Sequence, residues 1–281
     1  MKIATVGLGK LGAVIAATCA DAGHLVTGTD INAQLVADLS NGKSPFSEPG
    51  LQELIGSSAG RLKVAVDAQA AIEDADATLV VVPTPSRKGG GFSNHFVLSA
   101  LEDIGGALRE SGRPHTVMVC STVSPGSCKG ELIPALEMAS GKRVGESLGF
   151  VYSPQFIALG SIIANLKRPD MVLIGSSDER AADVAYEIWR SIAINEPSWQ
   201  RMSLSSAEIV KLAVNAFVTM KISFANMLDE LCQQVPGADS TAVTDAVGAD
   251  SRIGRKYLKG ALGYGGPCFP RDNRALEAFA S

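Results

Sequence analysis

Apolar and polar positions along the first two-thirds of the chain form blocks that predict strands and helices in turn. Apolar runs of strand length occupy residues 2–6, 25–29, 62–66, 78–82, 116–120, 150–152 and 171–174. Segments with helical spacing lie between them, at residues 13–22, 33–40, 96–110, 129–139 and 179–192. Strands that alternate with helices are typical of a parallel sheet covered on both faces. The pattern predicts a doubly wound, Rossmann-type α/β domain over residues 1–202.

The pattern changes after Arg201, where residues 205–235 are predicted to form one long helix. Apolar residues recur there at helical spacing, and no proline or glycine interrupts the run before Pro236 and Gly237. Because the helix is apolar on more than one side, we expect it to be buried between domains or against a second copy of the chain. Residues 203–281 are therefore predicted to form a helical region that makes the protein a homodimer.

Composition fits this architecture and excludes several classes of partner. The 281 residues are 46% hydrophobic but only 5% aromatic, as expected for parallel strands covered by helices of small residues. The net charge is −4 without a basic stripe, so no nucleic acid partner is expected. No segment has the uninterrupted apolarity of a membrane span, and the five scattered cysteines lack metal-ligand spacing. We expect a cytoplasmic protein with no membrane partner and no metal site.

The first predicted strand leads into a glycine-rich turn that is typical of dinucleotide-binding sites. The turn consists of Gly7, Leu8, Gly9, Lys10, Leu11 and Gly12. Its first glycine permits the tight turn, the second lets the backbone approach a pyrophosphate, and the third lets the following helix pack on the strand. Asp30 ends the second strand, where a carboxylate accepts hydrogen bonds from a ribose hydroxyl and repels a 2′-phosphate. The chain is predicted to bind NAD in preference to NADP.

Two other predicted strands end in turns that we expect to border this cofactor. Ligands of open α/β sheets bind beyond the carboxyl ends of the strands. The candidate residues in these turns are Val82, Pro83, Thr84, Ser121 and Thr122.

Cys268 is the strongest candidate for chemistry in the second region. Four glycine or proline residues lie among positions 263–267, which leaves room for a bulky ligand ahead of the sulfur. Pro270 suits the first turn of a helix predicted over residues 273–280. A thiol just before a helix N-terminus is favoured as thiolate by the helix dipole, and Asp272 adds a carboxylate nearby. We interpret Cys268 as a covalent catalyst rather than a structural thiol.

Lys211 and Asn215 lie one turn apart on the predicted long helix. A cation and an amide on one face of an otherwise apolar helix favour a ligand or catalytic role over a simple surface patch.

Taken together, these motifs resemble the UDP-glucose/GDP-mannose dehydrogenase family, which oxidises the C6 alcohol of a nucleotide sugar to a carboxylate with two NAD. The segments that carry the resemblance follow the family's order and are residues 44–51, 82–85, 211–216, 252–254 and 263–272. The resemblance implies that Cys268 is the nucleophile and that Lys211 and Asn215 stabilise an oxyanion. It also implies that Asp272 handles protons or water and that Thr122 positions water near the nicotinamide.

The same resemblance implies which residues contact the nucleotide sugar. Arg252 is expected to reach the site from a neighbouring subunit. The full set implied is Phe156, Ile157, Lys211, Asn215, Arg252, Lys259, Tyr264 and Gly265.

The residue types fit this chemistry without the family. A thiolate can trap the aldehyde left by a first oxidation, and a second oxidation then gives a thioester that water cleaves. Both steps place charge on one oxygen, and removing one donor aimed at such an oxygen costs ~3 to 4 kcal/mol.

Three features depart from the family's pattern. Gln155 stands where the family has a glutamate, and an amide can orient water but cannot carry its proton, so we expect slow thioester hydrolysis. Leu35 and Leu159 replace a cationic and an acidic cofactor contact. Family members continue past the position of Ser281 into a further α/β domain, so we expect a short form or a truncated chain.

Two alternatives stay open. A related NAD-dependent hydroxyacid dehydrogenase shares the glycine turn and a helical lysine but does not need Cys268. A non-catalytic nucleotide-binding or dimerisation fragment needs no turnover at all.

Overall fold

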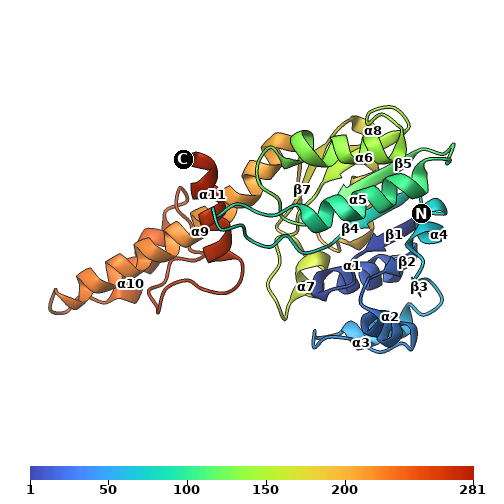
Figure 1. The fold of residues 1–281 in the computed structure, drawn as a ribbon. Helices are drawn as coiled ribbons and strands as arrows, with labels where there is room; N and C mark the ends of the chain where they lie inside the picture. The colour runs from blue at the N-terminus through green and yellow to red at the C-terminus, as the bar shows by residue number, and fades with distance from the viewer. The chain divides into compact units, whose positions relative to one another are not determined.

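An eight-stranded sheet forms the centre of the first unit in the computed structural model, which describes residues 1–281 (Figure 1). The strand order is β3-β2-β1-β4-β5-β6-β7-β8, and every neighbouring pair is parallel except β6 and β7. The strands are β1 (Lys2–Val6), β2 (Leu25–Thr29), β3 (Leu62–Ala65), β4 (Ala77–Val80), β5 (His115–Val119), β6 (Leu148–Tyr152), β7 (Met171–Ser176) and β8 (Ser198–Ser203). The predicted Rossmann-type sheet is confirmed, and β8 is a strand that the sequence pattern did not reveal.

Helices cover both faces of this sheet (Figure 1). One layer contains α1 (Lys10–Asp21), α3 (Leu51–Ser57), α7 (Ile162–Lys167) and α8 (Glu179–Ile192). The other contains α4 (Ala68–Glu73), α5 (His95–Leu108), the π-helical turn η1 (Cys128–Leu132) and α6 (Ile133–Ser140), while α2 (Ala33–Ser40) packs beside β3. None of the helices in the structure is long and apolar enough to cross a membrane.

The core of the first unit consists mainly of small and branched side chains, as the composition predicts. Ala16, Ala17 and Ala20 of α1 are at most 1% exposed, so this helix lies close to the strands. β1 pairs with both β2 and β4, and the chain therefore reverses direction across the sheet at β1. In open α/β sheets this switch point is where a ligand binds.

The second unit consists of residues 86–92 and 209–281. Its helices are α9 (Leu204–Gln233), which begins in the first unit, α10 (Ser240–Ala249) and α11 (Phe269–Ala280). The predicted long helix is confirmed with bounds 204–233 instead of 205–235, and α11 begins four residues before the predicted position 273. Residues 86–92 form a small hairpin, and its Phe92 joins Leu212 and Ala275 in a local core.

Candidate functional site

The glycine turn after β1 has no room for side chains at two of its positions. Gly7 has a φ of 93°, and a Cβ there would lie 2.5 Å from the carbonyl oxygen of Val81. A Cβ on Gly12 would lie 1.9 Å from the carbonyl oxygen of Gly7. At Gly9, the N-cap of α1, a Cβ would meet no atom within 4 Å. Glycine at positions 7 and 12 is therefore needed for packing, whereas at Gly9 it leaves the helix N-terminus open to a ligand.

Asp30 holds this turn from the end of β2. Its Oδ2 accepts a hydrogen bond from the Leu8 N–H at 2.6 Å, and its Oδ1 accepts one from the Asn32 N–H at 2.8 Å. Each carboxylate oxygen has two lone pairs, so Asp30 keeps capacity to accept from ribose hydroxyls. A dinucleotide fits this arrangement. The N–H groups that begin the 12-residue helix α1 are open to a phosphate at Gly9, and Asp30 lies beside them. Of the remaining turn residues, Lys10 is exposed and Leu11 is half-buried.

The turns after β4 and β5 are tied together by side-chain hydrogen bonds. Ser121 Oγ donates to the carbonyl oxygen of Val82 at 2.6 Å. Thr84 Oγ1 donates to the carbonyl oxygen of Thr122 at 2.7 Å. The five residues predicted to border the cofactor, which include Pro83, therefore form one contiguous structure at the carboxyl ends of neighbouring strands.

Glu208 belongs to the same region and was missed by the sequence analysis. It lies in the second turn of α9 and is only 1% exposed. Its carboxylate accepts the N–H groups of Gly126 and Cys128, each at 2.7 Å, and so binds the end of the turn that carries Thr122. A signal was present, because Glu208 stands one helical turn before Lys211 on the same face as Asn215.

The residues after β6 contribute one more polar side chain to the first unit. Gln155 Nε2 donates to the carbonyl oxygen of Ser153 at 2.9 Å, which fixes the direction of its amide. Phe156 and Ile157 are half-buried, and Ile157 packs against the core of this unit.

In the second unit, Cys268 differs from the other cysteines by its exposure. Burial raises the pKa of the Cys19 thiol to about 12 and also raises the pKa values of Cys120 and Cys128, so these three sulfurs stay protonated. Cys232 is half-buried, whereas Cys268 is exposed. Cys268 is also the N-cap of α11, with proline in the first turn after it, as the sequence predicts. Its sulfur therefore combines access with the positive end of a helix dipole.

The polar residues predicted to act with this cysteine lie together on α9 and α11. Asn215 Nδ2 donates to Asp272 Oδ2 at 2.6 Å, and the Asp272 N–H donates to the carbonyl oxygen of Cys268 at 2.9 Å. Burial lowers the pKa of Lys211, and the nearby charges of Asp272 and Cys268 oppose that shift. Arg271 Nε also lies 3.4 Å from Asp272 Oδ1. The second unit thus brings Cys268, Lys211, Asn215 and Asp272 into one cluster.

The residues predicted to contact the sugar nucleotide lie on exposed loops of the second unit. Arg252 has an 85% exposed side chain and pairs with Asp250 at 2.6 Å. Lys259 and Gly265 are exposed as well. Tyr264 is better anchored, because its hydroxyl accepts a hydrogen bond from Asn273 Nδ2 at 3.2 Å.

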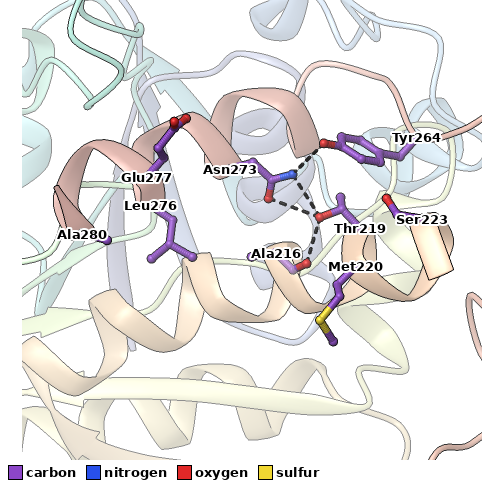
Figure 2. A pocket seen from close by; sticks show the side chains of 9 residues that line it. All are labelled: Ala216, Thr219, Met220, Ser223, Tyr264, Asn273, Leu276, Glu277 and Ala280. Atoms are coloured by element: carbon purple, nitrogen blue, oxygen red, sulfur yellow. Dashed lines mark hydrogen bonds between the residues drawn. The ribbon is translucent and has the colours of Figure 1, made fainter.

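Tyr264 borders an open groove of about 520 Å³ between α9 and α11 (Figure 2). Asn273 points into it and links Tyr264 to Thr219 Oγ1, at 3.0 Å from the Asn273 amide nitrogen (Figure 2). Leu276 and Met220 contribute apolar walls. The groove therefore combines a short polar network with apolar sides.

Models of two successive domains of one protein family match the chain. The model of the UDP-glucose/GDP-mannose dehydrogenase family's NAD binding domain matches residues 1–193, and the model of its central domain matches residues 205–281. The match to an NAD binding domain, together with the fit of the glycine turn, confirms NAD as the predicted cofactor.

Relatives are similar over the whole of this chain. A UDP-glucose 6-dehydrogenase of Haloferax volcanii is 38% identical over 100% of this chain and 65% of its own length. A GDP-mannose 6-dehydrogenase of Pseudomonas aeruginosa is 34% identical over 100% of this chain and 64% of its own length. The solved structure of a UDP-glucose dehydrogenase from Pyrobaculum islandicum has a TM-score of 0.90 and 37% identity, and the match covers 99% of this chain and 63% of that one.

This chain therefore spans less than two-thirds of the length of these relatives. Two family models that together match most of its residues, and relatives at this level of identity, show that the chain belongs to the UDP-glucose/GDP-mannose dehydrogenase family.

Proposed function

We propose that this chain carries the catalytic residues of an NAD-dependent nucleotide-sugar 6-dehydrogenase, which oxidises the C6 alcohol of a UDP-glucose-type substrate to a carboxylate. The observation that carries the proposal is the exposed thiol of Cys268 at the N-cap of α11, beside a buried lysine and a buried carboxylate. The relatives' names include both UDP-glucose and GDP-mannose, so the proposal leaves the base and the sugar open.

Cys268 provides the covalent step of the proposed reaction. When bound, NAD accepts a hydride in each of two oxidations. After the first, the Cys268 sulfur adds to the aldehyde carbon, and a proton goes to the former carbonyl oxygen, which gives a thiohemiacetal. The second oxidation turns this adduct into a thioester, and water then breaks the C–S bond to release the carboxylate and restore the thiol.

Lys211 and Asn215 stabilise the oxygen that carries charge in these steps. One Asn215 N–H is used by Asp272, and the second remains for the substrate oxygen. Lys211 is 7% exposed, so its ammonium acts where water screens it weakly. Removing either donor should cost ~3 to 4 kcal/mol of transition-state stabilisation.

The proposed function is tested by mixing the chain with NAD and a panel of UDP- and GDP-sugars and following NADH at 340 nm. We expect NADH with at least one sugar, and acyl mass on Cys268 in quenched samples. Cys268→Ser should stop turnover at or before the aldehyde, whereas Cys232→Ser, at a half-buried cysteine of the same unit, should behave as wild type.

Two other results would redirect the proposal. NAD binding without NADH from any sugar would favour a non-catalytic nucleotide-binding fragment. Turnover that survives Cys268→Ser would favour a hydroxyacid-dehydrogenase type of reaction.

Hydrolysis of the thioester is proposed to be the slow step, with Asp272 and Thr122 directing the water. Gln155 offers an amide in place of a carboxylate, and losing a positioned acid or base lowers a rate by ~10² to 10⁴. We expect a burst of NADH on the scale of the active sites, followed by a slow steady phase. Gln155→Glu should speed the steady phase alone. Progress curves that are linear from the first turnover would contradict this step.

The chain is also proposed to form a homodimer through α9. Phe217, Met220, Phe224, Met227 and Leu231 are 43–58% exposed in the chain. Their spacing alternates between three and four residues, which places them on one stripe of the kind that pairs helices. In such a dimer, the exposed Arg252 can serve the partner's substrate site. Sedimentation should give about twice 29.2 kDa, and a monomer at micromolar concentration would contradict the pairing.

A further inference from the structure

Glu208 is a buried carboxylate that the proposed reaction does not use. Its two oxygens accept the N–H groups of Gly126 and Cys128, both at 2.7 Å. Burial and the Glu208 carboxylate also raise the pKa of the Cys128 thiol, so the sulfur stays protonated and donates to the same carboxylate. Three donors at the start of a helical segment offset the cost of burying this charge.

The segment held by Glu208 is the turn that carries Thr122. At its start, the turn is fixed by Thr84 Oγ1, which donates to the Thr122 carbonyl oxygen at 2.7 Å. At its end, Gly126 has a φ of 89° and presents its N–H to Glu208. The turn is therefore tied to the β4 end on one side and to the second turn of α9 on the other.

We propose that Glu208 is a positioning residue for Thr122, an inference that rests on the proposed function, in which Thr122 lies at the nicotinamide end of NAD. Its carboxylate and the N–H groups of Gly126 and Cys128 fix where the turn ends, and so where the Thr122 side chain stands. A displacement of about 1 Å at such a position costs ~10² in rate.

The test is a double-mutant cycle of Glu208→Gln and Thr122→Ala in the full chain. Glutamine keeps one acceptor but turns an N–H₂ group toward a backbone N–H, so one of the two bonds to the turn is lost. We expect Glu208→Gln to weaken NAD binding about tenfold by calorimetry, as for one charged hydrogen bond, and to lower kcat with KM for the sugar unchanged. In the Thr122→Ala background, the same substitution should add less than about twofold, since it acts through Thr122.

Glu137→Gln is the matched control. Glu137 also accepts a backbone N–H, that of Val144 at 2.9 Å, and it lies in the same unit. We expect this variant to leave NAD affinity unchanged. Hydrogen exchange of the Gly126 and Cys128 amides adds a readout without substrate, and both should exchange at least tenfold faster in Glu208→Gln.

Additive effects in the cycle, or wild-type NAD affinity and amide exchange in a folded Glu208→Gln variant, would overturn the proposal. If that variant does not fold, Thr84→Val replaces it, because it removes the hydroxyl that holds the other end of the turn and should be equally non-additive with Thr122→Ala. If wild type makes no NADH from any sugar, the proposed function fails, while NAD affinity and amide exchange still decide the role of Glu208.

Discussion

Helices α1 and α9 differ in how many polar side chains they bury, although both are rich in apolar residues. In α1 the buried residues are apolar apart from Thr18, which bonds within the helix to the Val14 carbonyl oxygen, and Ala17 is 0% exposed. In α9 the buried residues include Lys211 at 7% and Thr219 at 4%, whereas Phe217 and Met220 are 58% and 55% exposed. Burying a polar group costs free energy unless it is hydrogen-bonded, so packing alone does not explain α9.

The polar face of α9 is explained by what it holds. Its side chains bond to segments that follow it in the chain: Asn215 to Asp272 at 2.6 Å, Thr219 to Asn273 at 3.0 Å, and Asn226 to the Ala261 N–H at 2.8 Å. These segments include the loop that ends at Cys268. Helix α1 is therefore a packing helix, while α9 supports the candidate chemistry and leaves an apolar stripe exposed.

The largest expected effect comes from crowding α1. Gly12→Ala would place a Cβ 1.9 Å from the Gly7 carbonyl oxygen. This backbone atom cannot move aside as easily as the end of a flexible side chain. We expect this variant to lose more than about 3 kcal/mol of unfolding free energy and to lose NAD binding. Denaturant titration and calorimetry measure the two losses.

Gly9→Ala separates packing from cofactor contact in the same turn. A Cβ at Gly9 meets nothing within 4 Å, so the unfolding free energy should stay near that of wild type while NAD binds more weakly. Equal stability of Gly12→Ala and Gly9→Ala would contradict the packing role of α1.

The second prediction concerns a buried polar residue that the first unit keeps neutral. Burial lowers the pKa of His115 from its ordinary value of 6.5 to about 4. The hydrogen bond to the Ala75 carbonyl oxygen raises this pKa, but burial has the larger effect. As pH falls, His115 is protonated in the unfolded chain before it is protonated in the folded one. The folded state therefore has its full stability above pH 6.5 and loses about 3 kcal/mol of unfolding free energy as pH falls toward 4.

The measurement is the unfolding free energy at several pH values between 7 and 4. His115→Gln should remove this part of the pH dependence. Burial also lowers the pKa of His24, but that contribution is present in both proteins and cancels in the difference. Parallel curves for wild type and His115→Gln would show that His115 does not drive the loss.

The third prediction breaks the polar face of α9. Asp272 is 1% exposed, and Asn215→Ala removes the amide that donates to it. A buried acceptor left without this donor should cost about 2 kcal/mol of unfolding free energy. Gln233→Ala is the control, because its amide makes a similar bond, at 2.9 Å, to Asp229 at an exposed place on the same helix. If Gln233→Ala lost as much unfolding free energy as Asn215→Ala, burial of the acceptor would not determine the cost of removing its donor.

The same contrast explains how far the sequence predicts the fold. Strands such as β1 and β2 were predicted with their observed bounds, because a short apolar run between two helices can form few structures other than a buried strand. β8 was missed because it is an edge strand of mixed, largely exposed residues, and its pairing with β7 depends on tertiary structure. Helix α9 does carry apolar residues on more than one side, as predicted, but the sequence pattern did not reveal which face is buried.

The candidate site shows the same limit. Cys268, Lys211 and Asp272 could be predicted because unusual residues stand in unusual local contexts. Glu208 was missed because its partners are the backbone N–H groups of Gly126 and Cys128, far away in the chain, and backbone donors have no sequence signature. Only its position one helical turn before Lys211 marked it in the sequence.

The smallest expected effect on folding comes from the exposed stripe of α9. Phe217 is 58% exposed, so Phe217→Ser removes little buried area and should change the unfolding free energy of the monomer by less than about 0.5 kcal/mol. If the stripe pairs two copies of the chain, the same substitution should weaken self-association at least about tenfold, because a serine at a helix seam loses apolar burial there. Sedimentation at graded concentrations measures the second effect and denaturation of the dilute protein the first.

Ala17→Ser in α1 is the counterpart: at 0% exposure, it should destabilise the fold and leave association unchanged. A Phe217→Ser variant that unfolds easily but associates like wild type would show that α9 is a packing helix after all.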